Sequence, residues 1–515
     1  AVVDLRGRGL SGFASRRVTD VNRGINTVTT YNQNFPYTGM VTSVTVRRNN
    51  NALLSKSTVT NAATKRAYAG GVTWFPYVKQ RVTHDYELNG ARVRTVKTTS
   101  TYDGYGNAGT VTRSQSTNGG ASYPWSQTTV NGYYAHNAAS WLVGRLKRTA
   151  VTYRAPNTAA ITRVTELAYG GGNAVNLVTS ERVAPNTGLE LKTTYSYDKF
   201  GNVTKGVVAS TNPNVAARPS STVYDGRGRF PTKLSNAVGH VQEPTDHAQL
   251  GVVTKLVDAK GLVTTSSYDV FGRVLKQVHS DKTVTETSRA WCRNLGNDCP
   301  ARAVYRIGTR HTGDGVKFEY RDMLDRVVRA RTPGVWNKMV YVETIYDALG
   351  RVSAESRPFF GGGAKYWTRY SYDLRDRVWK ETGPATTVKT GTPTRTVSYQ
   401  GRTTVSIDAM GKKTTRVVDA LGRLTTVRDH NGSVLNRRYD AAGNLVSTTD
   451  HAGNVTRMSY NVRGQRNSLD DPDTGKWSYS HNAFGELTWQ RDPNTKVTTF
   501  GYDKLGRMVW RKAPE

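Results

Sequence analysis

Short runs of Val, Thr and Tyr, separated by turn signals that contain Asp and Gly, recur along most of this 515-residue chain. In residues 258–274, one Asp-x-x-Gly turn ends at Gly261, a strand-like run follows, and a second such turn ends at Gly272. β-Branched and aromatic residues suit a pleated, half-buried surface, and Asp and Gly favour tight turns. The pattern therefore predicts β-hairpins in series rather than helices.

The dipeptide Tyr-Asp marks the repeat. It occurs eight times, against roughly two copies expected from composition. Four residues after the Tyr comes Gly in seven copies, and Asp376 takes that place in the copy that begins at Tyr372. Arg or Asn follows in every copy. The repeat-motif positions that we expect to shape the fold are Tyr102, Asp103, Gly106, Tyr197, Asp198, Gly201, Tyr224, Asp225, Gly228, Tyr268, Asp269, Gly272, Tyr346, Asp347, Gly350, Tyr439, Asp440, Gly443, Tyr502, Asp503 and Gly506.

The repeat is most regular near the C-terminus. Its turn glycines there are spaced by 21 residues, at Gly422, Gly443, Gly464, Gly485 and Gly506. A second set of turn glycines lies between them, so one unit holds two strands and two turns. Asp after Tyr can bond the backbone two residues on, and the later Gly supplies the left-handed residue that closes a bulged hairpin.

Such hairpins cannot bury their own faces, so each must rest on its neighbours. A long antiparallel sheet also twists and curls. We therefore predict an all-β fold, an antiparallel ribbon of β-hairpins that coils on itself.

The iterated motif Tyr-Asp-x-x-Gly-Arg, with its partner Asp-x-x-Gly-x-x-Thr, resembles the RHS/YD-repeat family. That family includes bacterial Rhs polymorphic toxins, the B and C components of Tc insecticidal toxin complexes, and the eukaryotic teneurins. The segments 7–13, 34–39 and 471–477, and the cysteine hairpin, resemble the Tc B component. The resemblance implies a spiral of antiparallel β-hairpins that forms a hollow shell or part of one. It also implies a division into residues 1–100, the end of a middle-domain-like β region, and residues 101–515, the repeat shell. In the toxins, such a shell sequesters a C-terminal effector.

The two cysteines enclose a turn. Gly296, Asn297 and Asp298 lie between Cys292 and Cys299 and favour a tight bend. A disulfide at this hairpin tip would stabilise the fold by roughly 2–3 kcal/mol and would suit an oxidising, extracytoplasmic setting. Two free thiols are the alternative. A zinc site needs four ligands, and no second Cys or His pair is near, so we expect no metal.

The charge leaves two interpretations open. Lys and Arg number 72 and Asp and Glu 39, a formal net charge of +33, and the basic residues are spread along the chain without a block. They could form a solvated β-surface or attract anionic polymers. No catalytic constellation is visible, and the aspartate-based core motif of the family has no match, so we expect neither an enzyme nor a cofactor.

These observations favour a structural shell segment that encapsulates a toxic effector domain in a secreted or delivered bacterial toxin. The alternative is an extracellular adhesion module that recognises anionic glycans or surface polymers. The expected partners are an enclosed effector domain, other toxin-complex subunits and anionic surface polymers. No apolar stretch approaches the length of a membrane span. We expect a secreted or surface location, although the first residues show no signal segment.

Overall fold

The computed structural model describes residues 3–4, 9–10, 12–68, 70–137, 139–171, 176–385 and 392–513. The expected resemblance at residues 7–13 falls partly outside these described residues. Within them the chain is almost entirely β-strand, with three short 3₁₀ turns, η2 (Cys292–Asn294), η3 (Gly296–Asp298) and η4 (Val335–Asn337). The predicted all-β class is confirmed.

The first part of the chain supplies strands of two to sixteen residues, among them the longest strands in the described residues. They are β1 (Val3–Asp4), β2 (Gly9–Leu10), β3 (Ser15–Asp20), β4 (Ile25–Tyr31), β5 (Val41–Arg48), β6 (Leu53–Tyr68), β7 (Gly71–Tyr86), β8 (Arg92–Tyr102), β9 (Ala108–Ser116), β10 (Trp125–Tyr133), β11 (Leu146–Arg154), β12 (Ile161–Tyr169), β13 (Val178–Val183), β14 (Leu191–Tyr197), β15 (Val203–Ser210), β16 (Arg218–Tyr224) and β17 (Pro231–Ser235).

The middle of the chain continues with shorter strands. They are β18 (Val241–Asp246), β19 (Val253–Val257), β20 (Val263–Tyr268), β21 (Val274–Val278), β22 (Val284–Trp291), β23 (Tyr305–His311), β24 (Lys317–Arg321), β25 (Val327–Pro333), β26 (Met339–Tyr346), β27 (Val352–Ser356) and β28 (Phe359–Phe360).

The last part is the most regular. It comprises β29 (Trp367–Tyr372), β30 (Val378–Thr382), β31 (Thr394–Gln400), β32 (Thr403–Ile407), β33 (Lys413–Val418), β34 (Leu424–Arg428), β35 (Val434–Tyr439), β36 (Leu445–Thr449), β37 (Val455–Tyr460), β38 (Arg466–Asp471), β39 (Gly475–His481), β40 (Leu487–Arg491), β41 (Val497–Tyr502) and β42 (Met508–Lys512).

These strands form one antiparallel ribbon in chain order. Each strand from β3 onward pairs with the next, except that β27 pairs with β29 and the short β28 lies against β26. In the described residues β3 pairs only with β4 and β42 only with β41, so strand pairing leaves the ribbon open at both ends. The expected division at residue 100 stays a prediction, since β8 spans it and pairing continues on both sides.

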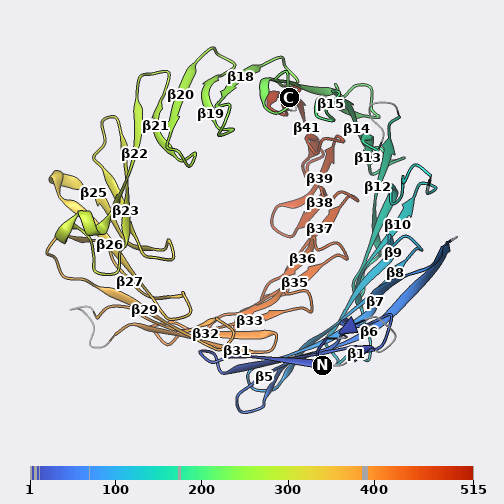
Figure 1. Cartoon of the computed structure of the whole chain (residues 1–515), viewed down its shortest axis with the longest axis horizontal. Helices are drawn as coiled ribbons and strands as arrows, with labels where there is room; N and C mark the ends of the chain where they lie inside the picture. Colours follow the sequence, from blue (N-terminus) through green and yellow to red (C-terminus); the bar gives the residue numbers. More distant parts are fainter. Residues whose placement is uncertain are drawn as a thin grey trace.

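The ribbon curls into a spiral, as predicted (Figure 1). It rises through β6–β15, crosses near β18, descends through β20–β27 and returns through β29–β33. Strands β35–β41 then rise beside the strands with which the spiral began. We call β3–β27 the first turn and β29–β42 the second turn.

The wall is a single sheet with little core. Fully buried large side chains are rare among the described residues, and Tyr320 is the largest of them. Several other buried positions hold alanine, such as Ala420, Ala441 and Ala483. A thin wall with solvent on both faces buries less apolar surface than a solid globule, which matches the polar composition of the chain.

Candidate functional site: the seam of the spiral and its opening

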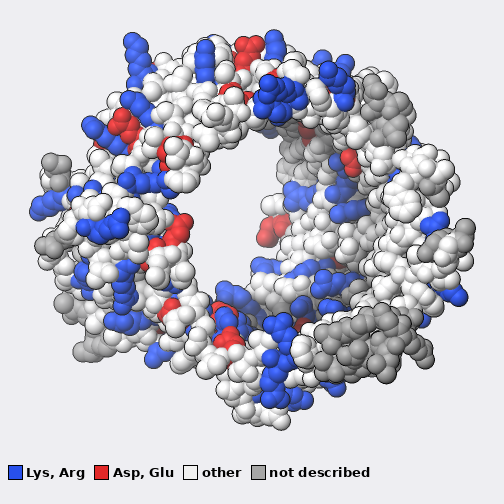
Figure 2. Space-filling model, in the orientation of Figure 1, with Lys and Arg blue, Asp and Glu red and all other residues white. Residues whose placement is uncertain are grey.

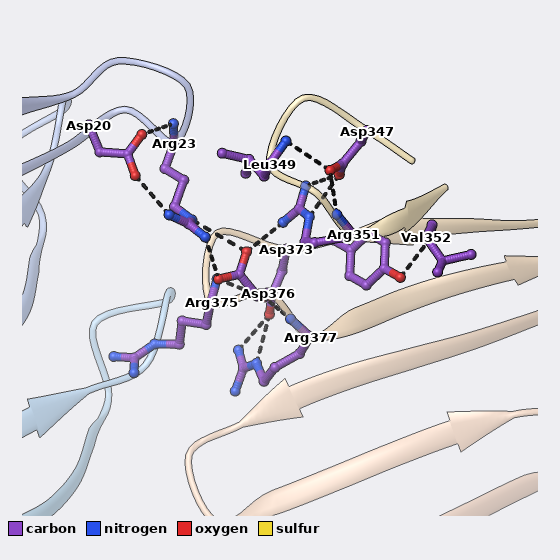
Figure 3. Close-up of polar contacts among 11 residues, drawn as sticks. Asp20, Arg23, Asp347, Leu349, Arg351, Val352, Asp373, Arg375, Asp376 and Arg377 are labelled. Carbon is purple, nitrogen blue, oxygen red and sulfur yellow. Dashed lines mark hydrogen bonds and ion pairs between the residues drawn. The ribbon is translucent and has the colours of Figure 1, made fainter. Parts of the chain in front are cut away.

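Each Tyr-Asp turn is held by its own aspartate. At the turn after β26, Asp347 accepts hydrogen bonds from the backbone N–H groups of Leu349 and Arg351, both at 2.9 Å, and from Nε of Arg351 at 2.8 Å (Figure 3). Gly350 takes a φ of 82°, which only glycine adopts without strain. Burial alone would raise the pKa of Asp347, but these hydrogen bonds outweigh it and the pKa lies below its usual value.

Neighbouring repeats are fastened to each other through Arg and Tyr. The guanidinium of Arg351 lies 4.5 Å from the ring centroid of Tyr372 in the next repeat, and the Tyr372 hydroxyl donates to the carbonyl of Val352 at 2.7 Å. The same pair of contacts joins Arg423, Tyr439 and the carbonyl next to Arg423 in sequence. The motif residues thus form a ladder in which the Asp orients the Arg, the Arg stacks on the following Tyr, and the Tyr bonds back to the strand.

The seven Tyr-Asp-x-x-Gly turns expected from the sequence all lie on one edge of the ribbon. They connect β8 to β9, β14 to β15, β16 to β17, β20 to β21, β26 to β27, β35 to β36 and β41 to β42. Since alternate turns of an antiparallel ribbon lie on opposite edges, we call this the YD edge and the other one the opposite edge. Each of the seven turn glycines has a positive φ.

The two turns of the spiral meet along what we call the seam. There the YD edge of the second turn contacts the opposite edge of the first turn. The residues joined in this way are 268 to 353 positions apart in sequence. The turn motif is therefore used twice, to close a hairpin and to join one coil of the ribbon to the next.

The densest part of the seam surrounds Asp376, the residue that replaces the repeat glycine. Asp376 keeps the left-handed backbone, with a φ of 61°. Its carboxylate accepts from Arg23 in the turn between β3 and β4 at 2.8 Å, and from Arg351 of the adjacent repeat at 2.6 Å (Figure 3). Burial raises the pKa of Asp376 and the hydrogen bonds from Arg23 and Arg351 lower it further than that, so it titrates below its ordinary range.

An Arg–Glu pair lies beside Asp376. Arg377 reaches across the seam to Glu87, whose two carboxylate oxygens accept from its guanidinium at 2.6 and 2.9 Å. Glu87 is only 2 % exposed. Burial raises its pKa, but the hydrogen bonds from Arg377 and from the N–H of Leu88 hold the pKa below its ordinary value. Arg375 donates to the backbone carbonyls of Leu54 and Tyr86 on the first turn.

The seam continues along the second turn with the same chemistry. Arg163 of β12 donates to the carbonyl of Val462 at 2.9 Å, and Arg218 of β16 pairs with Glu486 at 2.5 Å. In the other direction, Arg463 donates to the carbonyl of Leu189 at 3.3 Å. Arginine side chains supply several hydrogen-bond donors to backbone and carboxylate acceptors. The contacts across the seam are therefore polar and directional rather than apolar.

The repeat did not reveal most of the seam residues. The repeat-motif positions do not include Arg23, Glu87, Arg163 or Arg218. No pattern in the neighbouring sequence distinguishes these four residues. Asp376 is the exception. A carboxylate at a left-handed position that otherwise holds glycine indicates that its side chain makes a specific contact there.

The cysteines lie in the loop between β22 and β23, on the YD edge of the first turn. Cys292 and Cys299 form a disulfide. The loop folds back so that Asp298 contacts Arg331 at 2.9 Å and also pairs with Arg306, next to the buried Tyr320. Disulfide and ion pairs together anchor a segment that has no strand pairing of its own.

The spiral encloses an open centre. Figure 2 shows this opening, with Lys and Arg on the wall that faces it over the segments labelled β33 to β37 in Figure 1. Among the described residues no group of three or more His, Cys, Asp or Glu side chains is placed to hold a metal ion. None of the described residues forms a helix long and apolar enough to span a bilayer.

Part of the chain matches a known repeat family, and its fold matches solved structures. The RHS repeat family matches residues 418–450 and 439–476. No curated protein matches the chain. Solved structures match its whole length, among them TcdB2-TccC3-TEV, with a TM-score of 0.77 and 11 % identity over 100 % of this chain and 39 % of that one.

Two further structures agree. TcdB2-TccC3 without its hypervariable C-terminal region gives a TM-score of 0.76 at 10 % identity over 100 % of this chain and 39 % of that one. The Photorhabdus luminescens Tc holotoxin pore gives 0.73 at 10 % identity over 95 % of this chain and 37 % of that one. The chain thus spans about two fifths of the length of these structures.

The chain accordingly shares the fold of these Tc toxin structures along its whole length. Residues 418–476 carry the repeats that the family recognises in sequence. The rest of the spiral shares the fold of those structures at 10–11 % sequence identity.

Proposed function

We propose that this chain is a wall segment of a hollow shell that encloses a toxic effector polypeptide within a secreted bacterial toxin complex. The observation that carries the proposal is the open spiral, whose second turn is joined to its first by a seam of arginine contacts. The wall has a small core and a continuous antiparallel ladder, which suits a container better than a compact catalytic domain. In this proposal no residue performs chemistry, and other toxin-complex subunits or segments complete the shell.

The exposed rim of the first turn supports the need for such additional parts. Its YD-edge turns carry large apolar residues in solvent, including Phe271 and Met323. Exposed apolar clusters at an edge commonly mark a contact surface. The adhesion alternative, which rests on the net charge, stays a prediction.

Protease protection tests the proposal. The full-length protein that contains this chain is digested with a broad-specificity protease, and cleavage of the effector region is followed by mass spectrometry. We expect the effector to resist digestion, and to become accessible in a variant with Arg23→Ser and Arg377→Ser, which removes two seam contacts. An Arg302→Ser and Arg310→Ser variant, with the same loss of charge away from the seam, serves as the control. Equal digestion of the effector in all three proteins would contradict enclosure.

A further inference from the structure

A groove lined by unpaired arginines crosses the wall where the second turn meets strands β7–β11. Three neighbouring cavities, of about 460, 280 and 530 Å³, share lining residues and make it continuous. Arg113 and Gln127 belong to the first two, and Trp125 to the second and third. We call Arg81, Arg113, Arg154, Arg438 and Arg457 the arginine groove.

Strand register aligns two of these side chains, Arg81 and Arg113. Arg81, Thr98, Arg113, Gln127 and Tyr153 are directly paired across β7 to β11, so they form one row on one face of the sheet. Arg81 and Arg113 are two strands apart, which is roughly 10 Å.

The second turn contributes a matching row. Arg438 and Arg457 are both paired with Ser447, so they too lie on one face, two strands apart. Charges at this spacing suit an extended polyanion better than one small anion.

The arginine groove differs from the arginines of the turns. Turn arginines such as Arg351 and Arg423 are neutralised by the aspartate that orients them. For the five groove arginines the described part of the chain provides neither an ion pair nor a side-chain hydrogen bond. Asp419 is the single acidic residue among the cavity-lining residues, and it is already bound to Arg423. The groove therefore holds uncompensated positive charge on the structure as it stands.

The remaining lining residues favour a polypeptide over a nucleic acid. Thr83, Thr98, Thr129 and Gln127 offer hydrogen bonds along the groove. Its aromatic residues, Trp125, Tyr153 and Tyr439, line the second and third cavities. A single-stranded nucleic acid is usually held by aromatic side chains spaced to stack successive bases, and the stretch between Arg81 and Arg113 has none.

We infer that the arginine groove binds an extended, acidic segment of polypeptide. This inference rests on the proposed function, in which the bound segment would belong to the enclosed cargo. Lys and Arg face the central opening over β33–β37 (Figure 2), which places positive charge on the side that such a cargo would meet. Binding there would position the cargo against the wall through charge and would weaken as salt screens it.

A peptide titration tests the inference on the full chain. Fluorescence anisotropy measures binding of a fluorescein-labelled oligoglutamate peptide at low ionic strength, for the native chain and for an Arg81→Ser and Arg113→Ser variant. We expect the variant to bind about tenfold more weakly. The control variant, Arg302→Ser and Arg310→Ser, removes the same charge from exposed positions around β22–β23 and should change binding by less than about twofold.

Three results would overturn the inference. One is the absence of peptide binding, and another is equal weakening in both variants, which would mean that the net charge acts diffusely. The third is tighter binding of a labelled single-stranded oligonucleotide at the same groove. The titration contains neither cargo nor other subunits, so its failure leaves the protease test of enclosure unaffected.

Discussion

The YD edge behaves differently in the two turns of the spiral. In the second turn its tips carry small residues that the seam buries, such as Ala441 at 5 % and Ala483 at 1 % exposed. In the first turn several tips instead carry large apolar residues in solvent, such as Phe271 at 77 % and Met323 at 83 % exposed. The hairpin chemistry is the same in both places. The size of the tip side chain differs between tips that another coil of the ribbon covers closely and tips that lie in solvent.

The strongest way to break this comparison is to enlarge a buried tip. Ala483→Trp puts a ring where the seam has no room, and overpacking of this kind costs about 3 kcal/mol. Ala348→Trp, at the equivalent position of a more exposed turn, is the matched control and should change stability by less than about 0.5 kcal/mol. Urea unfolding followed by circular dichroism measures both. Equal effects would mean that the seam does not confine its tips.

Removing a seam charge should have a smaller effect. Glu87→Gln keeps the shape of the side chain but removes the anionic partner of Arg377 across the seam, leaving it only Asp373, and should lower the free energy of unfolding by about 2 kcal/mol. The control is Glu319→Gln, which removes an exposed partner of Arg321 and should cost less than about 0.5 kcal/mol. A comparable loss for the two variants in thermal unfolding would place the seam pair on a level with surface pairs.

Acid should loosen the seam. The pKa values of Glu87 and Asp376 lie below their ordinary values of 4.5 and 3.8 in the folded chain. The folded state therefore binds fewer protons, and the stabilisation is fully present above the ordinary values and is lost as pH falls through the lowered ones. Limited proteolysis at decreasing pH should detect the opening, and Glu87→Gln should show a weaker pH dependence. The same cleavage profile for the native chain and for Glu87→Gln throughout the acid titration would contradict this.

The ladder between repeats can be weakened without touching the seam. Tyr346→Phe removes the hydroxyl that donates to the carbonyl of Val327 at 3.0 Å, which should cost about 1 kcal/mol. Tyr502→Phe is the control, because the described residues show no hydrogen bond from that hydroxyl. Chemical unfolding compares the two variants, and a larger loss for Tyr502→Phe would argue against the ladder.

The smallest effect on stability is expected at the free rim. Replacing Phe271 and Met323 with Ser should change the free energy of unfolding by less than about 0.5 kcal/mol, since both side chains lie in solvent. It should also reduce binding of an apolar dye or self-association, because the exposed apolar surface becomes smaller. A marked loss of stability would show that these tips pack within the chain.

Much of the fold could be predicted because its determinants are local. Asp347, Gly350 and Arg351 lie within five residues of one another, and their hydrogen bonds close a hairpin without help from elsewhere. Repetition of that unit then predicts a curling ribbon. The use of Arg351 to stack on Tyr372 was not predicted, since the repeat showed both residues but not that one repeat leans on the next.

The candidate site was less predictable for the same reason. The contacts of Arg218 with Glu486 and of Arg377 with Glu87 join residues 268 and 290 positions apart. Which residues face one another depends on the curvature accumulated over a whole coil of the spiral. The arginine groove likewise combines the registers of two coils, and no sequence pattern pointed to it in advance.

The sequence alone determined the hairpin, the two edges of the ribbon and the all-β class, because a turn aspartate, a left-handed glycine and strand-forming residues act over a few bonds. The tertiary structure decided where the coils meet, which tips are covered and which arginines remain without a partner. Those outcomes depend on the small twist added at each strand, summed over hundreds of residues, and no short segment contains that sum.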